Sequence, residues 1–268
     1  MLKNVNLIRA QAAAVAAAKA VGVDMRRNLN QPKSANEVTQ HDIKLELDVQ
    51  SQTMIEGRLR KAFPAIPILG EEGLVGDTTS GVRWVVDPID GTVNFAYSIP
   101  HACVSIALQG RCEKGRPDYE DGYNTLLGVV YDPFCNELWT AIRGQPAMLN
   151  GVPAKVSQRR RLAEALVSMG FAKTRENLDA TLPYFVELVH KIRKMRIMGA
   201  AALALTYTAS GRFEAYIERG VRLWDIAAGG LILESAGGRF EHHAVDSNYT
   251  YSLLATNGVI HRKFVIPK

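Results

Sequence analysis

The sequence predicts a globular α/β protein in which strands and helices interleave. Short runs rich in β-branched and aromatic residues alternate with longer segments that have the apolar spacing of helices. The alternation lacks the even strand–helix rhythm of a barrel. Apolar residues make up 47% and charged residues 22% of the 268 residues, close to the globular average, which excludes disordered and fibrous classes. By its length, the chain forms one large domain or two small lobes.

Charge, cysteine content and hydropathy exclude further classes. The net charge of +5 and the pI of about 9.1 permit nucleic-acid binding but do not indicate it, because cations spread over such a surface need form no patch. The three cysteines include no C-x-x-C pair, which favours a reducing cytoplasm over a zinc site or a disulfide framework. No apolar run reaches the roughly 18 residues that a membrane helix needs. We therefore expect a soluble cytoplasmic protein without a membrane partner.

The first half of the chain predicts two helices and then a series of strands. The alanine-rich residues 4–28 predict a helix that ends before the turn-rich stretch 28–36. Apolar spacing over residues 43–63 predicts a second helix, which Pro64 stops. Residues 110–124 mix glycine, proline and charged residues and predict a hairpin loop. Short apolar runs predict strands at residues 66–70, 83–86, 103–108, 128–131 and 138–142.

The second half predicts mainly helices. Ser157 as an N-cap predicts a helix through Leu166. Further helices are expected at residues 183–194, 200–208 and 224–236, the last of them closed by two glycines. Strands are expected at residues 213–217 and 253–256. The pair His242-His243 is typical of an exposed loop, and no third ligand suggests a metal there.

Acidic residues follow an apolar strand in the segment 84–95, which reads WVVDPIDGTVNF. The strand ends at Asp87, and Asp90 follows three residues later, close enough for both carboxylates to meet one cation. Gly91 and Thr92 can bring backbone N–H groups and a hydroxyl against an anion. Hard oxygen ligands on a loop suit Mg²⁺. On spacing alone, the two acids could equally cap a turn and the next helix.

Two further acidic positions favour the metal interpretation. Glu71 and Glu72 follow another apolar run, and Asp225 begins an apolar helix. Three acidic clusters, each at the end of an apolar element, repel one another unless a cation joins them. The sequence therefore predicts a divalent-metal centre.

The segment 84–95 and the segment 224–238, WDIAAGGLILESAGG, resemble the two signatures of the inositol monophosphatase family, lithium-sensitive Mg²⁺-dependent phosphatases of sugars and polyols. GEE at 70–72, GVVYDP at 128–133 and LNG at 149–151 match in family order, so the resemblance covers nearly the whole chain. It implies the layered αβαβα sandwich of the inositol monophosphatase and fructose-1,6-bisphosphatase type. It also implies a homodimer of single-domain chains, 1–268, with two lobes of about 1–150 and 151–268.

The resemblance implies a role for each matching residue. It implies two or three Mg²⁺ per subunit, held by Glu71, Asp87, the carbonyl of Ile89, Asp90 and Asp225. It implies phosphate and substrate contacts from Asp90, Gly91, Thr92, Gly199, Ala200, Ala201, Glu218 and Asp225, with Glu218 on the polyol hydroxyls. Glu71 and Thr92 would activate the attacking water, and Asp48 would orient Thr92.

Three positions depart from the family pattern, one of them the family's Thr-Gly-Phe-Pro segment, which stands here as SMGFA at 168–172. The family's usual Val-Thr-x-Ala-Asp stands here as KLELD at 44–48. The upstream lysine is therefore either Lys33 or Lys44, and the acid either Asp42 or Asp48, of which Asp48 better keeps the helical register. Ala200 stands where many relatives carry Ser or Thr. These changes leave the predicted metal ligands intact but weaken any inference about the substrate.

The resemblance implies hydrolysis of a small polyol or sugar phosphate, most closely of inositol 1-phosphate to inositol and phosphate. Asn94 and Phe95 at the end of the first signature resemble the inositol-phosphate branch. Fructose 1,6-bisphosphate, histidinol phosphate and glycerol phosphate remain alternative substrates. A non-catalytic role in RNA and transcription complexes, known among bacterial relatives, is an alternative from another class. A retired active site would have lost a metal ligand, and none is missing.

Overall fold

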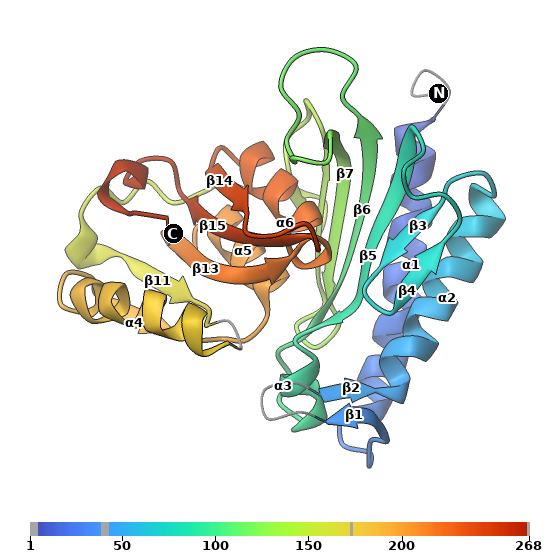
Figure 1. The fold of residues 1–268 in the computed structure, drawn as a ribbon, viewed down its shortest axis with the longest axis horizontal. Coiled ribbons are helices and arrows are strands. Elements are labelled where there is room, and N and C mark those ends of the chain that lie inside the picture. The colour runs from blue at the N-terminus through green and yellow to red at the C-terminus, as the bar shows by residue number, and fades with distance from the viewer. Residues whose placement is uncertain (1–4, 39–42, 172–173, 267–268) are drawn as a thin grey trace.

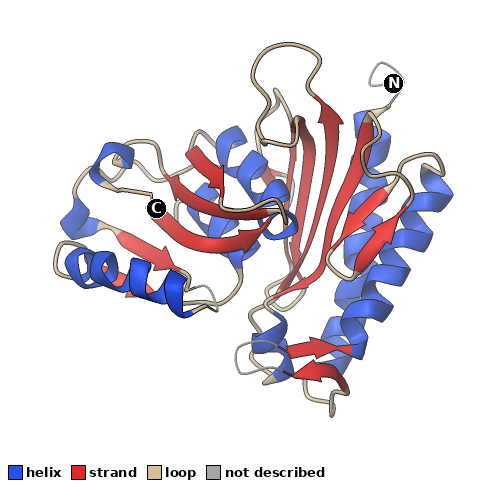
Figure 2. Ribbon diagram, viewed as in Figure 1, coloured by secondary structure: helices blue, strands red, loops and turns tan. Residues whose placement is uncertain are grey.

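The computed structural model describes residues 5–38, 43–171 and 174–266. Its main helices and two large sheets lie in five layers in the order αβαβα (Figure 1, Figure 2). Two long helices cover one face of a large sheet, two more fill the space between this sheet and a smaller one, and another covers the outer face of the smaller sheet. The layered sandwich that the sequence predicts is therefore present.

The first layer consists of α1 (Leu7–Asn28) and α2 (Glu46–Ala62). Asn6 caps the start of α1, because its side chain accepts a hydrogen bond from the backbone N–H of Arg9 at 2.9 Å. The residues that α1 buries are mostly alanines, and such small side chains let the helix lie close to the large sheet. The predicted helix over residues 4–28 is confirmed within the described residues.

The second predicted helix begins later than expected. Residues Ile43–Leu45 form β2, which pairs antiparallel with β1 (Ala35–Val38), and α2 starts at Glu46. The buried carboxylate of Asp48 accepts the backbone N–H of Leu45 at 2.9 Å and fixes the helix start at this point. The apolar spacing within residues 43–63 could not predict the pairing of β1 with β2, because this pairing depends on a second segment of the chain.

The large sheet carries the strands predicted in the first half, several of them longer than expected. Its strand order is β10-β9-β8-β7-β6-β5-β3-β4, and β3 pairs parallel with β5. The strands are β3 (Ile68–Gly70), β4 (Gly73–Val75), β5 (Val82–Asp90), β6 (Cys103–Arg111), β7 (Tyr123–Asp132), β8 (Glu137–Ile142), β9 (Met148–Leu149) and β10 (Val152–Pro153). β5 runs through Asp87 and Pro88 to Asp90, whereas the sequence predicts that the strand ends at Asp87. The loop between β6 and β7 matches the predicted hairpin loop.

The helices α5 (Ala201–Ala209) and α6 (Leu223–Ser235) lie between the two sheets. Both are apolar around most of their circumference, as expected of helices that are covered on two sides. A Cβ at Gly128 of β7 would lie only 2.6 Å from the carbonyl oxygen of Ala228, so α6 packs directly on the sheet backbone. The hydroxyl of Ser105 on β6 donates to the carbonyl of Trp224 at 3.0 Å and anchors the first turn of α6.

The smaller sheet has the order β12-β11-β13-β15-β14 and is covered outside by α4 (Arg175–Val189). Its strands are β11 (Leu166–Met169), β12 (Lys194–Arg196), β13 (Ala215–Arg222), β14 (Arg239–Ala244) and β15 (Thr250–Thr256). Two predictions in this half are wrong, one in the bounds of a helix and one in the kind of element. The helix expected at 183–194 begins at Arg175 and stops at Val189, and the pair His242-His243 lies on β14 rather than in a loop.

The helix predicted from Ser157 to Leu166 is also wrong. This stretch is extended, apart from the 3₁₀ turn Leu162–Glu164, and it ends in β11. The buried carboxylate of Glu214 accepts hydrogen bonds from Ser157, from Arg159 and from the backbone N–H of Leu166. These contacts with a residue about fifty positions away outweigh the local helix signal.

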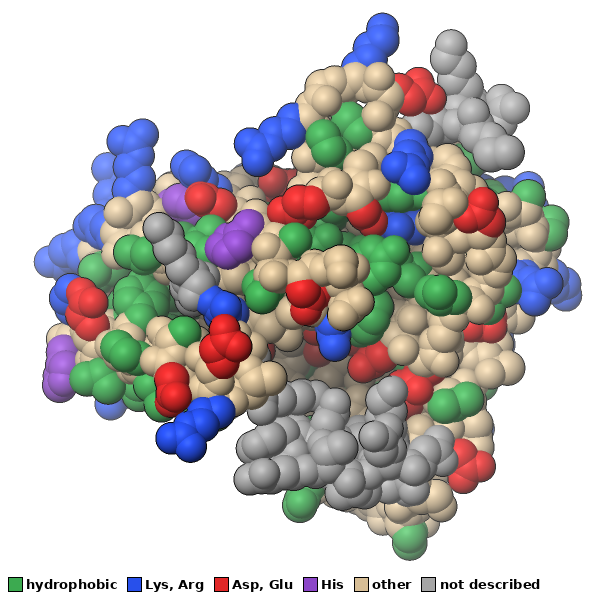
Figure 3. Space-filling view, in the orientation of Figure 1, with side chains coloured by type: hydrophobic (Ala, Val, Ile, Leu, Met, Phe, Trp, Pro, Cys, Tyr) green, Lys and Arg blue, Asp and Glu red, His purple; other side chains and the backbone are tan. Residues whose placement is uncertain are grey.

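The described surface agrees with the mild basic charge of the chain. On the face shown in Figure 3, Lys and Arg side chains are scattered among Asp and Glu side chains. In the described part of the chain, every helix is too short or too polar to cross a lipid bilayer.

Candidate metal and phosphate site

The first two acids of the candidate site lie on β5. Asp87 pairs in register with Ser105 and Asp90 with Cys103, so three steps on β5 match two steps on β6. Such a bulge places residues three apart on the same side of a strand, where regular alternation would separate them. Asp87 is 2% exposed and Asp90 is 7% exposed. The bulge therefore buries two carboxylates next to each other.

Asp90 is tied to the first turn of α5. Its Oδ1 accepts the backbone N–H of Ala201 at 3.1 Å, and its Oδ2 accepts that of Ala202 at 2.8 Å. The thiol of Cys103 also contacts Oδ2, at 3.6 Å. Burial raises the pKa of Asp90 to about 7, although the hydrogen bonds from Ala202 and Ala201 act in the opposite direction. These bonds fix Asp90 against a helix that the sequence places 111 residues away.

Asp87 lies among three other carboxylates. Burial raises its pKa well above the usual range, and the charges of Glu71, Asp90 and Asp225 raise it further. A hydrogen bond with Glu71 acts in the same direction. The structure thus brings together acids from the end of β3, from β5 and from the first turn of α6, as the sequence predicts.

The acids from the other two elements are held by backbone contacts. The backbone N–H of Glu71 donates to the carbonyl of Val86 at 3.1 Å, which continues the β3–β5 pairing past the end of β3. Asp225 caps α6, because its Oδ2 accepts the backbone N–H of Arg222 at 2.8 Å. Both carboxylates are thereby directed by the ends of regular elements.

The predicted phosphate segment forms a sharp corner between β5 and α3 (Thr92–Ala96). Gly91 has φ of +92°, a conformation that favours glycine, and a Cβ there would lie 2.9 Å from the carbonyl oxygen of His101. The hydroxyl of Thr92 donates to the carbonyl of Ile89 at 2.9 Å. The corner therefore brings Thr92 and the carbonyl of Ile89 next to the two acids of β5.

The predicted substrate segment 199–201 lies against this corner. Gly199 has φ of +73°, and a Cβ on Gly91 would come within 3.2 Å of the Cβ of Ala200. The side-chain amide of Asn94 donates to the carbonyls of His101 and Met198, at 2.9 and 2.8 Å. Asn94 thus joins the two segments, a structural role that the sequence reasoning missed.

Glu218 lies on β13, where its carboxylate accepts a hydrogen bond from the hydroxyl of Tyr216. Burial raises the pKa of the Tyr216 hydroxyl, and the charges of Glu218, Asp90 and Asp225 raise it further. The sequence singled out Glu218 but not Tyr216. Their contact depends on the alternation of side chains along β13, whereas the predicted strand ended at residue 217.

Of the candidates for the upstream lysine and acid, Lys33 and Asp48 lie among the described residues. The ammonium group of Lys33 donates a hydrogen bond to the carbonyl of Leu29 at 2.6 Å. Its Nζ lies 4.9 Å from the ring centre of Phe95. Asp42 and the side chain of Lys44 lie outside the described residues. The proposed orientation of Thr92 by Asp48 stays a prediction.

The model of the inositol monophosphatase family matches residues 7–263. The chain belongs to the inositol monophosphatase family. A Nus factor SuhB of Pasteurella multocida is 40% identical over 200 residues, which cover 74% of this chain and 71% of that protein.

An inositol monophosphatase 1 of Solanum lycopersicum is 36% identical over 245 residues, 89% of this chain and 86% of that protein. The solved inositol monophosphatase from Anabaena (Nostoc) has a TM-score of 0.80 and 33% identity, and the match covers 97% of this chain and 94% of that one. The predicted family and its fold are therefore confirmed. Its relatives carry two different functional names.

Inositol monophosphatases are in general Mg²⁺-dependent phosphomonoesterases. Among the residues that the structure describes, no group of three or more His, Cys, Asp or Glu side chains is arranged so that it could hold a metal ion as it stands. The carboxylates interact with one another, but the assignment of Glu71, Asp87, Ile89, Asp90 and Asp225 as metal ligands stays a prediction.

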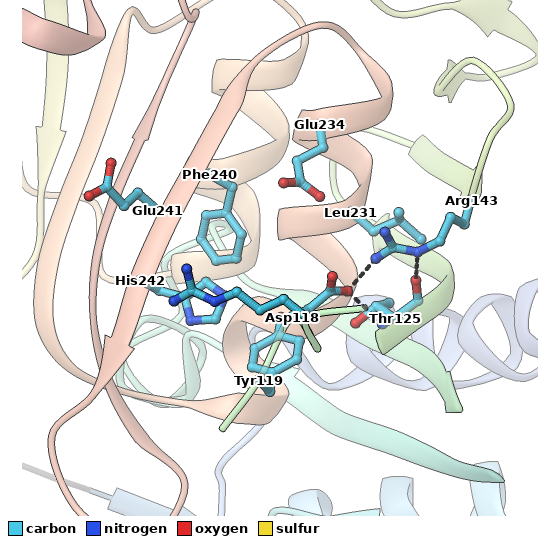
Figure 4. A pocket seen from close by; sticks show the side chains of 10 residues that line it. Asp118, Tyr119, Thr125, Arg143, Leu231, Glu234, Phe240, Glu241 and His242 are labelled. Carbon is cyan, nitrogen blue, oxygen red and sulfur yellow. Dashed lines mark hydrogen bonds and ion pairs between the residues drawn. The ribbon is translucent and has the colours of Figure 1, made fainter. Parts of the chain in front are cut away.

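A pocket of about 340 Å³ lies elsewhere on this inositol monophosphatase fold (Figure 4). It is bounded by the β6–β7 loop, the second half of α6 and β14, and Asp118 in its wall pairs with Arg143. Its lining consists of Arg116, Asp118, Tyr119, Thr125, Arg143, Leu231, Glu234, Phe240, Glu241 and His242. None of the predicted site residues lines this pocket, so it is not the candidate site.

Proposed function

We propose that this protein is a Mg²⁺-dependent phosphatase that hydrolyses a small polyol or sugar phosphate, and that inositol 1-phosphate is its substrate. One observation carries the proposal: buried Asp87 lies within the electrostatic reach of Glu71, Asp90 and Asp225, which come from three different elements. Four acids gathered in this way repel one another strongly when ionised, and above the pKa of Asp90, about 7, a cation is needed to neutralise them.

The residues present fit Mg²⁺. The predicted ligands are carboxylate oxygens and the carbonyl of Ile89, which are the hard donors that this ion prefers. No histidine is among them, and the thiol of Cys103 contacts Asp90 rather than replacing a carboxylate. Bound Mg²⁺ would neutralise the phosphate and lower the pKa of a water molecule. We infer two or three ions per subunit, as in the family.

The residues of the chain divide the work on the substrate. Glu71 and Thr92 hold the attacking water, and Glu71 accepts its proton as the water oxygen attacks phosphorus. The backbone at Gly91 and Thr92 binds the phosphate oxygens, and Asp90 holds this corner against α5. The bond from phosphorus to the inositol oxygen breaks, this oxygen takes up a proton from a water molecule of the solvent, and the products are inositol and phosphate.

The other end of the substrate meets the second half of the chain. We assign the polyol hydroxyls to Glu218 and the segment from Gly199 to Ala201. We assign a further substrate contact to Asp225, which lies in the first turn of α6 and within electrostatic reach of Asp87. Asp48 is proposed to orient Thr92 through the helix start that it fixes.

We further propose that the chain is a single domain and acts as a cytoplasmic homodimer. Both sheets pack against α5 and α6, so the two halves share one core. Cys103, Cys112 and Cys135 are all unpaired, in keeping with a reducing compartment. Light scattering after size-exclusion chromatography would then give twice the chain mass of 29.4 kDa.

The decisive experiment measures phosphate release from inositol 1-phosphate, fructose 1,6-bisphosphate, histidinol phosphate, glycerol 2-phosphate and 3′-phosphoadenosine 5′-phosphate, with Mg²⁺ and with EDTA. We expect turnover that depends on Mg²⁺, is fastest with inositol 1-phosphate, and falls by about a hundredfold or more in Asp90→Asn. The matched control is Asp179→Asn on the exposed face of α4, which should retain full activity. Faster turnover of another substrate would reassign the substrate within the same reaction.

A second candidate function rests on the similarity to a Nus factor SuhB, at 40% identity. On this alternative the chain would act without catalysis, in a transcription complex. Silence of every substrate, in a folded protein that still binds Mg²⁺, would favour this alternative over the phosphatase.

A further inference from the structure

Tyr216 and Glu218 stand two residues apart on β13, so their side chains lie on the same face of the smaller sheet. That face packs against α5 and α6, and Tyr216 is 2% exposed within the core between the sheets. The hydroxyl of Tyr216 donates a hydrogen bond to Oε2 of Glu218. The only hydrogen that this buried hydroxyl can donate is therefore used in the hydrogen bond to Glu218.

Gly170 faces the same carboxylate from the neighbouring strand. It follows β11 directly, and its backbone N–H donates to the carbonyl of Ile217 at 3.0 Å, which extends the parallel pairing of β11 with β13. A Cβ at Gly170 would overlap the carboxylate of Glu218. Gly170 is not among the residues of positive φ, so this position requires space and not a special backbone conformation.

Acids of other elements also act on Tyr216. The pKa of the Tyr216 hydroxyl is raised by burial, then by the charge of Glu218, and also by the charges of Asp90 and Asp225. The hydroxyl thus bonds to Glu218 and lies within the electrostatic influence of the acids of β5 and α6.

We propose that Tyr216 and Gly170 are positioning residues, which together hold the carboxylate of Glu218 where it recognises the hydroxyls of a polyol phosphate. Tyr216 fixes the carboxylate by its hydrogen bond, and Gly170 leaves the room that the carboxylate occupies. The inference rests on the proposed function and deepens it, since it names the residues that select polyol phosphates over other phosphate monoesters.

The kinetic test compares inositol 1-phosphate with p-nitrophenyl phosphate, which has no polyol hydroxyls. In Tyr216→Phe we expect KM for inositol 1-phosphate to rise about tenfold, equivalent to about 1.4 kcal/mol, with kcat changed less than about twofold. Both constants for p-nitrophenyl phosphate should stay within about twofold of the original protein. Gly170→Ala should show the same selectivity. Tyr251→Phe, a buried tyrosine of the same core cluster, is the control and should change neither substrate.

A double-mutant cycle separates positioning from general packing. In a Glu218→Ala background, adding Tyr216→Phe should change KM for inositol 1-phosphate by less than about twofold, because the hydroxyl then has no carboxylate to hold. An equal loss on both substrates, or a full tenfold effect in the Glu218→Ala background, would overturn the inference.

Crystal structures of the unchanged protein, of Tyr216→Phe and of Gly170→Ala supply a readout that needs no activity. We expect the carboxylate of Glu218 to move in both variants, while the backbone of β13 stays in place. An unmoved carboxylate in both variants refutes the inference even if inositol 1-phosphate proves to be the substrate. If the original protein hydrolyses no polyol phosphate, the proposed function fails, and recognition of polyols by this pair fails with it, whatever the crystals show of Glu218.

Discussion

The side-chain amide of Asn94 donates a hydrogen bond to the carbonyl of Met198, 2.8 Å away and 104 residues later in the chain. A second bond from the same nitrogen reaches the carbonyl of His101. Asn94 therefore joins the corner that follows β5 to the segment that leads into α5. The two segments that the sequence assigns to phosphate and substrate are held together by one amide group.

We predict that Asn94→Ala reduces both stability and activity. Two partly buried carbonyls lose their donor, which should lower the free energy of unfolding by about 1–3 kcal/mol. The corner and the substrate segment then move apart, so kcat/KM for inositol 1-phosphate should fall by about tenfold or more. Urea denaturation and phosphate release measure the two effects. Asn28→Ala, which removes one amide contact within a single helix end, should change activity little, and an equal loss of activity in both variants would contradict the prediction.

We predict that the metal-free protein loses stability as the pH rises from 5 to 7. An aspartate in the unfolded chain ionises near pH 4, whereas the pKa of Asp90 in the folded protein is raised to about 7. Between these values the folded state holds more protons, so the free energy of unfolding falls with pH, by about 2 kcal/mol for Asp90 alone. The raised pKa of Asp87 acts in the same direction.

Chemical denaturation in EDTA at pH 5 and pH 7 measures this fall. Asp90→Asn should show a smaller fall than the original protein, and Asp179→Asn, which changes an exposed acid, should show the full one. A fall of the same size in Asp90→Asn would mean that Asp90 does not cause it.

We predict that Mg²⁺ stabilises the protein, and more so at pH 8 than at pH 6. Protons and the cation compete for the same carboxylates, and deprotonated acids bind the cation more tightly. At a free Mg²⁺ concentration a hundred times Kd, binding to one site adds about 2.7 kcal/mol. Thermal unfolding with Mg²⁺ and with EDTA measures the gain. Asp87→Asn should remove most of it, and an undiminished gain in that variant would argue against Asp87 as a ligand.

We predict that Gly128→Ala is strongly destabilising. The added Cβ would lie 2.6 Å from the carbonyl oxygen of Ala228, and neither backbone can yield without separating α6 from the large sheet. We expect a loss of about 2–4 kcal/mol in urea denaturation. The control is Gly57→Ala in α2, which has no neighbour within 4 Å and should gain about 0.5–1 kcal/mol. Similar effects of the two substitutions on the free energy of unfolding would show that the close contact between Gly128 and Ala228 does not restrict the side chain at position 128.

The elements that the sequence predicts well are those whose signal is local. α1, α5 and α6 are long apolar or alanine-rich segments with recognisable ends, and the structure has them within a few residues of the predicted bounds. The acids of the candidate site were found for a similar reason. Each stands directly beside an apolar element, and the strand and helix ends then bring them together.

The parts that could not be predicted depend on partners distant in the chain. The stretch after Ser157 is extended because buried Glu214 binds it from another strand. The bulge in β5 shows only in its register with β6. The contacts of Asn94 and Tyr216 likewise arise from the fold, and no spacing in the sequence predicts them.

The bonds from Ala201 and Ala202 to Asp90 also set an order of events during translation. The large sheet can form as soon as residues 1–153 have left the ribosome, but Asp90 then lacks the two N–H donors that arrive 111 and 112 residues later. Asp225 follows later still. A nascent chain therefore carries three of the four acids, Glu71, Asp87 and Asp90, at one end of its first sheet until α5 and α6 dock, and the complete carboxylate cluster is among the last features of the molecule to assemble.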